Sequence, residues 1–222
     1  MRASTRTLNT MVLALALCIA GNAWAAVTTY TDRSTWLGAG GPASFTADFE
    51  SFATDTSFAT SPVNVGPFTL STIGTASADS NFIDASPFAF SPIPPSFGNA
   101  CAEIFVQDPV MARLDLSSPV SGLFTDFLYA GNGEQLQLTV SLLSGATAEL
   151  AVPGTGTDLV PFGFISSDDP ITGITFHNIA NDGFIIDNVS GQGVPEPCSA
   201  SLIGLGLVAS WISRRWKRQR SA

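Results

Sequence analysis

An alternation of apolar and polar residues runs through most of the chain between residues 26 and 193 and predicts a series of short β-strands. It is clearest at residues 135–140, where Leu136, Leu138 and Val140 are separated by polar residues. Because successive strand residues point to opposite faces of a sheet, a period of two indicates a strand with one buried face. Similar or weaker patterns occur at residues 26–30, 45–49, 68–73, 103–106, 112–116, 122–129, 147–152, 159–165, 171–176 and 184–189.

The residues between these segments are typical of turns and of one short helix. Ser144-Gly145 separates residues 135–140 from 147–152 and predicts a hairpin. Asp32 stands where a helix cap is expected, and the glycines at 38, 40 and 41 predict the end of one or two helical turns. We expect Trp36 to hold that helix against the core. Residues 75–100, rich in Ser, Pro, Gly and Ala, predict a loop or an irregular edge.

About nine to eleven short strands with one short helix predict an all-β fold, an antiparallel β-sandwich with jelly-roll topology. The segment 26–193 is long enough to form one domain with its own hydrophobic core. We therefore expect a single β-sandwich domain between two differently composed ends.

The first 25 residues have the three parts of a secretory signal peptide. Arg2 and Arg6 supply the positive region, and residues 11–20 are an uninterrupted apolar run. The apolar run predicts a signal helix that is too short for a stable membrane anchor. Ala23 and Ala25 form a small-x-small cleavage site, which makes Ala26 the expected first mature residue.

Residues 194–222 form a second three-part segment. A proline-rich break, Val194-Pro195-Glu196-Pro197, precedes an uncharged apolar run at residues 198–212. As a helix this run would be about 22 Å long, and we expect it to be the single transmembrane helix of the chain. A cationic cluster behind it would stay on the cytoplasmic side of the inner membrane. The cluster consists of Arg214, Arg215, Lys217, Arg218 and Arg220.

This order of a Pro-Glu-Pro break, an apolar helix and terminal arginines resembles the PEP-CTERM sorting signal of Gram-negative surface proteins, a tail that is also catalogued as an ice-binding-protein C-terminal domain. The resemblance implies export by the translocon, transient tethering in the inner membrane and cleavage near Pro195–Pro197 by an exosortase. It also implies delivery to the cell surface or the medium and an association with exopolysaccharide and biofilm. The ice-binding label concerns the tail alone, because the body shows no repeated threonine array.

Charge is distributed very unevenly along the chain. Seven of the nine Lys and Arg residues lie in the two end segments, so residues 26–193 keep only Arg33 and Arg113. Of the 18 acidic residues only Glu196 lies outside this body, which therefore carries a net charge of about −15. Such a surface repels nucleic acid, because nucleic-acid binding depends on Lys and Arg contacts to phosphate. We expect no nucleic-acid partner.

The two ends of the body carry a second resemblance. Residues 48–52, Asp-Phe-Glu-Ser-Phe, are similar to the first strand of exported jelly-roll domains, including carbohydrate-binding modules. Residues 184–190 are similar to their last strand. In those domains an acid from each strand often helps to hold a structural calcium ion. The resemblance implies Glu50 and Asp187 as calcium ligands, whereas the alternative is a solvated Glu50 and an Asp187 that caps a turn.

The other candidate residues are better explained by structural roles than by catalysis. His177 is the only histidine, and the alternation at 174–177 places it on the solvent side, without a recognisable nucleophile partner. Cys101 is the only cysteine of the body, so we expect a buried, inert thiol and no disulfide. Asp168-Asp169 precedes Pro170, which indicates a turn rather than a catalytic pair.

Two further groups are weaker candidates. Asp79-Ser80-Asn81 and Asp84 offer oxygen ligands at loop spacing, but they lack the glycine and the distal glutamate of an EF-hand, which favours a polar loop. Trp36, Tyr30 and Tyr129 could stack on sugar rings.

The sequence therefore predicts an exported, non-enzymatic envelope protein. A carbohydrate-binding module or adhesin is the first alternative, and a secreted hydrolase is the second.

Overall fold

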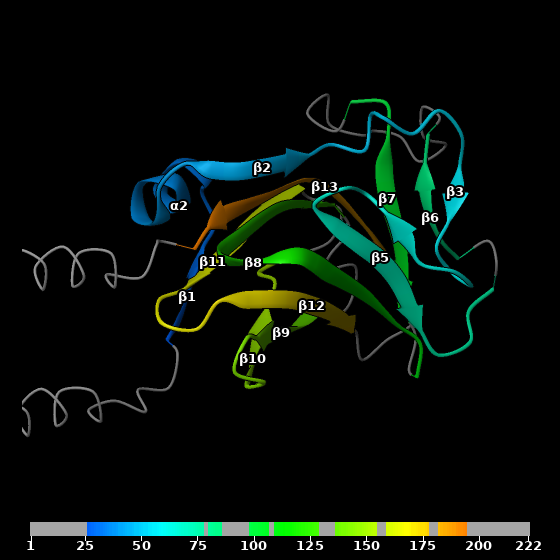
Figure 1. Cartoon of the computed structure of the whole chain (residues 1–222). Helices are drawn as coiled ribbons and strands as arrows, with labels where there is room; N and C mark the ends of the chain where they lie inside the picture. Colours follow the sequence, from blue (N-terminus) through cyan, green and yellow to red (C-terminus); the bar gives the residue numbers. More distant parts are fainter. Residues whose placement is uncertain are drawn as a thin grey trace, which may run out of the picture.

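The computed structural model describes residues 26–77, 80–85, 98–106, 109–128, 136–154, 159–177 and 182–194. These residues form thirteen strands and one helix, and every strand pair is antiparallel (Figure 1). The prediction of an all-β antiparallel fold is confirmed. Its arrangement is that of a β-sandwich, whereas the jelly-roll strand order stays a prediction.

One long strand, β8 (Met111–Leu128), belongs to both layers of the sandwich. Its first part, residues 111–116, pairs with β5 (Phe68–Ile73) and β12 (Ile171–His177). Its last part, residues 122–128, pairs with β11 (Leu159–Ser166) and β13 (Asp182–Gly193). The prediction of two separate strands here is wrong, because the exposed residues 117–119, with Pro119 among them, continue the extended chain from one layer into the other.

The remaining strands extend each layer outward from β8. In the first layer β5 pairs with β4 (Val63–Asn64), and β12 pairs with β9 (Gln137–Leu142), which forms the predicted hairpin with β10 (Thr147–Ala151). In the second layer β11 pairs with β1 (Val27–Tyr30), while β13 pairs with β7 (Cys101–Val106) and with β2 (Ala43–Ala47). Beyond β7 lie β6 (Asn81–Asp84) and β3 (Thr56–Ser57).

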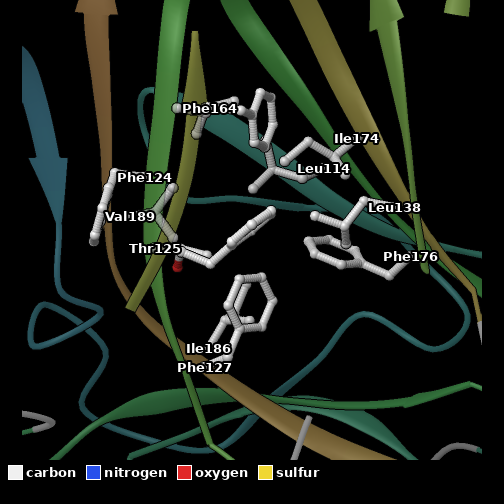
Figure 2. A pocket seen from close by; sticks show the side chains of 12 residues that line it. Leu114, Phe124, Thr125, Phe127, Leu138, Phe164, Ile174, Phe176, Ile186 and Val189 are labelled. Carbon is white, nitrogen blue, oxygen red and sulfur yellow. The ribbon is translucent and has the colours of Figure 1, made fainter. Parts of the chain in front are cut away.

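The core lies between the two layers and is rich in phenylalanine. Phe176 of β12 contacts Phe127 of β8 and Phe184 of β13, with ring centroids 6.4 Å and 5.5 Å apart. Figure 2 shows Phe127 and Phe176 pointing toward one another among Leu, Ile and Val side chains from both layers. Each of the three rings is at least 97% buried. The layers are therefore joined mainly by apolar burial.

The predicted helix is α2 (Arg33–Gly40), and it covers the outer face of the second layer. The carboxylate of Asp32 accepts hydrogen bonds from Ser34 Oγ and from the backbone N–H of Thr35, which lower the pKa of Asp32 to about 2. Gly41 ends the helix with a φ of 89°, a conformation that favours glycine. Trp36 is fully buried and packs on Phe124 at 5.4 Å, as the sequence predicted.

Gln192 of β13 locks α2 onto the sheet. Its Nε2 donates to the carbonyl oxygens of Trp36 and Gly41, at 3.1 Å and 2.8 Å. A Cβ on Gly40 would lie 2.0 Å from Gln192 Oε1, and one on Gly122 would lie 2.5 Å from the same atom. Both glycines are therefore required for this close approach of helix and strand.

Part of the region predicted as loop is a strand. Residues 81–84 form β6, although the sequence predicted a loop or irregular edge over 75–100 and a polar loop at 79–84. Asn81 is fully buried because its Oδ1 accepts from the N–H of Phe105 and its Nδ2 donates to Thr72 Oγ1. These partners are distant in sequence, so the alternation alone could not predict a buried asparagine there.

Replacing Trp36 with alanine should lower the free energy of unfolding by about 3–5 kcal/mol, because it removes the largest fully buried side chain of α2. Urea melts followed by circular dichroism measure this loss. Leu143, 59% exposed, is the matched control, and its change to alanine should stay within about 0.5 kcal/mol. A loss for Trp36→Ala as small as that of the control would contradict the packing described.

Candidate metal centre

The chain makes a sharp corner directly after β2. Phe49 has a φ of 58°, a conformation that is strained for a bulky residue, and its side chain is 99% buried against Phe68 at 6.1 Å. On either side of it, Asp48 and Glu50 are exposed. Glu50 Oε1 accepts from the backbone N–H groups of Asn99 and Ala100, at 2.6 Å and 3.1 Å. These bonds, that from Asn99 first, lower the pKa of Glu50.

A β-bulge in the last strand lies beside this corner. Asp187 of β13 is opposite Asp126 of β8, and Ser190 is opposite Phe124, so β13 uses one residue more than β8 over this stretch. Asn188, at the bulge, has a φ of 52°, which asparagine tolerates better than most residues. Two carboxylic acids, Asp187 and Asp126, are therefore paired across neighbouring strands beside the bulge.

Arg33 of α2 holds the bulge in place. Its guanidinium donates to Ser190 Oγ at 2.6 Å and to the carbonyl oxygen of Asn188 at 2.9 Å. It also lies 3.5 Å from Asp126 Oδ2 and 4.5 Å from the centre of the Phe124 ring. Asn188 Nδ2 donates to the same oxygen of Asp126, at 3.1 Å. Burial nevertheless raises the pKa of Asp126, since it outweighs the opposing effect of Arg33.

Asp187 receives no comparable cation. Its side chain is 99% buried, and its Oδ1 has no hydrogen-bond partner among the described residues. Burial raises the pKa of Asp187 to about 8, against a hydrogen bond from the Asn188 N–H that lowers it. The negative charges of Asp126, Asp48 and Glu50 raise it further. A carboxyl group in this place either keeps its proton or, when ionised, needs a cation beside it.

The acidic surroundings continue across β7 and β6. Cys101 is opposite Asp84, and the register places it beside Asp187 on the same face of the sheet. Burial and the charge of Asp187 raise the pKa of the Cys101 thiol to about 12, so the prediction of a buried, inert free thiol is confirmed. Burial and the charges of Asp84 and Asp55 raise the pKa of Glu103 to about 7.

Glu50 lies near enough to Asp187 for its charge to raise the pKa of Asp187. The hydrogen bonding of the two carboxyl groups differs. Within the described ranges no three His, Cys, Asp or Glu side chains are arranged to hold a metal ion. The unpartnered, buried Oδ1 of Asp187 fits a hard cation such as calcium, which prefers oxygen ligands. Glu50 is exposed, and its Oε1 accepts hydrogen bonds from the backbone N–H groups of residues 99 and 100.

His177 lies on the solvent side of β12, as predicted, and joins a polar group that the sequence did not indicate. Its Nε2 lies 2.9 Å from Thr139 Oγ1 and 3.3 Å from Glu149 Oε2. Both contacts involve the same ring nitrogen, whereas a triad places the base and its orienting acid on opposite nitrogens. The register of β9, β10 and β12 creates this group.

The structure decides two other predictions. Residues 167–170 connect β11 to β12, and Asp169 accepts from the N–H of Ser144 and from its Oγ, so the turn at Asp168-Asp169 is confirmed. Trp36 is fully buried and cannot stack on a sugar, which makes that candidate wrong. Tyr129 and Asp79 lie outside the described residues.

Most of the predicted signal peptide and of the predicted sorting tail also lies outside the described residues. This applies to Ala23, Ala25, residues 195–197, the predicted helix at 198–212 and the cations from Arg214 to Arg220. Ala26 and Val194 are described, and both are exposed. Among the described residues, no helix has the length and apolar character needed to span a bilayer.

No protein-family model and no curated protein matches the chain. Solved structures with a similar chain path include a family 29 carbohydrate-binding module in complex with mannohexaose (17% identity, 64% of this chain and 94% of that chain, TM-score 0.37). Others are the family 11 carbohydrate-binding module of a Clostridium thermocellum cellulase (14%, 68% and 94%, 0.30) and the tailspike protein 4 of bacteriophage CBA120 (15%, 59% and 20%, 0.34). At these identities and TM-scores the likenesses establish neither a ligand nor an activity for this chain.

Stability in the presence of a chelator should fall as pH rises from about 4 to about 8. Asp187 and Glu103 have raised pKa values in the folded protein, so the folded state binds more protons than the unfolded state over this range. One such group contributes a slope of about 1.4 kcal/mol per pH unit. Urea melts at several pH values measure the slope.

Asp187→Asn should remove most of the slope above pH 7, because the amide resembles the protonated acid and cannot ionise. Asp168→Asn, in an exposed turn, is the matched control and should keep the slope of the unchanged protein. A slope that is equally steep in Asp187→Asn would show that another group titrates.

Proposed function

We propose that this chain is the precursor of an exported, non-enzymatic envelope protein that is trimmed at both ends and sorted by an exosortase into an exopolysaccharide matrix. The observation that carries the proposal is the position of the folded domain. Its first strand begins at Val27, directly after the predicted mature terminus Ala26, and its last strand ends at Gly193, directly before the Pro-Glu-Pro break.

Trimming at these positions would remove no strand of the domain. β13 lies inside the second layer, paired with β8 on one side and with β7 and β2 on the other. Cleavage inside this strand would break the core, whereas cleavage beyond Gly193 would leave it intact. Ser121 Oγ holds the end of the strand by donating to the carbonyl of Gly193 at 3.0 Å. This anchoring supports a folded domain that ends where the processing signal begins.

The charge distribution of the body supports the proposed location outside the cytoplasm. Arg33 and Arg113 are both paired with aspartates, so no unpaired lysine or arginine remains in residues 26–193 to attract nucleic acid or anionic lipid. All cations that could hold the chain at a membrane are in the two end segments that processing would remove.

Intact-mass analysis of the protein from a Gram-negative host with the processing enzyme tests the proposal. The expected mass begins at Ala26 and ends near Pro195–Pro197, with any attached glycan adding to it. Changing Pro195, Glu196 and Pro197 together to alanine should leave the tail in place, whereas Pro153→Ala, at an exposed proline of the domain, should not affect trimming. Recovery of the unmodified chain with both ends intact would overturn the proposal.

A structural divalent cation, expected to be calcium, completes the proposed mature domain. Asp187 Oδ1 would be its buried ligand, and Glu50 could contribute only if its bonds to residues 99–100 were rearranged. The ion would add positive charge beside Asp48, Glu50 and Asp187, whereas Arg33 already faces Asp126.

Millimolar calcium should raise the melting temperature above pH 8 relative to a chelator, and Asp187→Asn should abolish this rise. Glu50→Gln separates two roles for Glu50. A lower baseline with an unchanged calcium effect indicates a backbone cap, whereas a reduced calcium effect indicates a ligand. Differential scanning calorimetry measures both, with Asp168→Asn as the control. A calcium effect that persists in Asp187→Asn would remove the ion from this site.

A further inference from the structure

The outer face of the first layer is formed by β5, β8, β12, β9 and β10 (Figure 1), and most of the side chains in two rows that cross it are polar. We propose that this surface, here called the hydroxyl face, binds a neutral polysaccharide chain. The proposal deepens the proposed function, because it assigns the contact with the exopolysaccharide matrix to specific side chains.

The register aligns the side chains in two rows across the five strands. The first row runs Ser71, Arg113, Thr175, Thr139 and Glu149. The second row runs Thr69, Asp115, Gly173, Ser141 and Thr147. With neighbouring strands about 4.8 Å apart, each row is about 19 Å long. This length can seat several sugar rings side by side.

The hydroxyl face carries few charges, although the body as a whole is strongly acidic. Arg113 Nε donates to Asp115 Oδ1 at 2.7 Å, and the two side chains remain 43% and 45% exposed. Glu149 accepts from Thr139 Oγ1 at 2.8 Å and lies 3.3 Å from the ring of His177. The one arginine of the face is thus paired with an aspartate, so a polyanion would meet no unpaired lysine or arginine here.

The chemistry of the face also argues for a sugar polymer. Its hydroxyl groups donate and accept hydrogen bonds, as do the hydroxyls of a polysaccharide. No aromatic or large aliphatic side chain belongs to the two rows, and the half-buried Ile73 and Met111 lie in the next row of the same face. Gly173 has no side chain, so nothing projects from the sheet between Asp115 and Ser141 in the second row.

The outer face of the second layer has a different character. α2 covers one part of it, and the corner at residues 48–50 lies over another. What remains carries Asp84, Glu103 and Asp55, whose charges affect one another. This face suits a cation, and the hydroxyl face is the one that suits a neutral, hydroxyl-rich ligand.

Affinity electrophoresis of the exported protein tests the proposal, with dextran and a soluble β-glucan as neutral probes and alginate as an anionic probe. At least one neutral probe should retard the protein. Thr139→Val and Thr175→Val keep the shape and strand preference of threonine but remove a hydroxyl. Each should weaken binding roughly fivefold, and the double variant more. Thr28→Val, exposed on β1, is the matched control and should bind normally.

Thermal melts establish that the variants fold, and hydrogen exchange locates the contact independently. Added polysaccharide should slow exchange in β9 and β12 more than in β1 and β11. Failure of every neutral probe, retardation by alginate alone, or equal binding by the Thr139→Val, Thr175→Val and Thr28→Val variants would overturn the proposal. Processing of the two ends is read by mass, so a chain that binds polysaccharide but keeps its tail would reject the proposed sorting and leave the hydroxyl face supported.

Discussion

Arg33 supplies the positive charge that holds the second layer together, and only one other arginine and no lysine is present in residues 26–193. Its guanidinium reaches Ser190, the carbonyl of Asn188 and Asp126, and it covers the ring of Phe124. Helix α2, the bulge of β13 and the centre of β8 therefore meet at one side chain. Because arginine offers several donors in a fixed plane, it can satisfy all these groups at once, which lysine could not do.

The same shortage of cations leaves Asp187 without a positively charged partner among the described residues, and its Oδ1 without a hydrogen bond there. Burying an ionised carboxylate costs several kcal/mol unless a charge or a proton compensates it. Here the neighbours are the acids Asp126, Asp48 and Glu50, so the cost is increased. The composition of the body and the geometry of the bulge together explain why the pKa of this carboxyl group is raised.

The two outer faces of the sandwich consequently differ in their chemistry. The second layer concentrates buried or half-buried acids and is partly covered by α2, whereas the first layer pairs its charges locally and exposes hydroxyl groups. A core of phenylalanine rings separates the two faces, and the long strand β8 contributes to both, with Arg113 and Asp115 on one and Asp126 on the other. A difference in composition along one strand thus becomes a difference between two sides of a domain.

The sequence by itself determined the all-β class, the capped helix with buried Trp36, most strands, the inert Cys101 and the outward His177. These features depend on local alternation and on single residues with strong preferences. Only the tertiary structure decided that β8 is continuous, that Asn81 is buried in a strand and that Asp187 is the uncompensated carboxyl group beside Asp126. It also brought Thr139, Glu149 and His177 together. Each of these depends on strand register and on partners 9 to 64 residues away, and the free energy of such contacts is not encoded in any short segment.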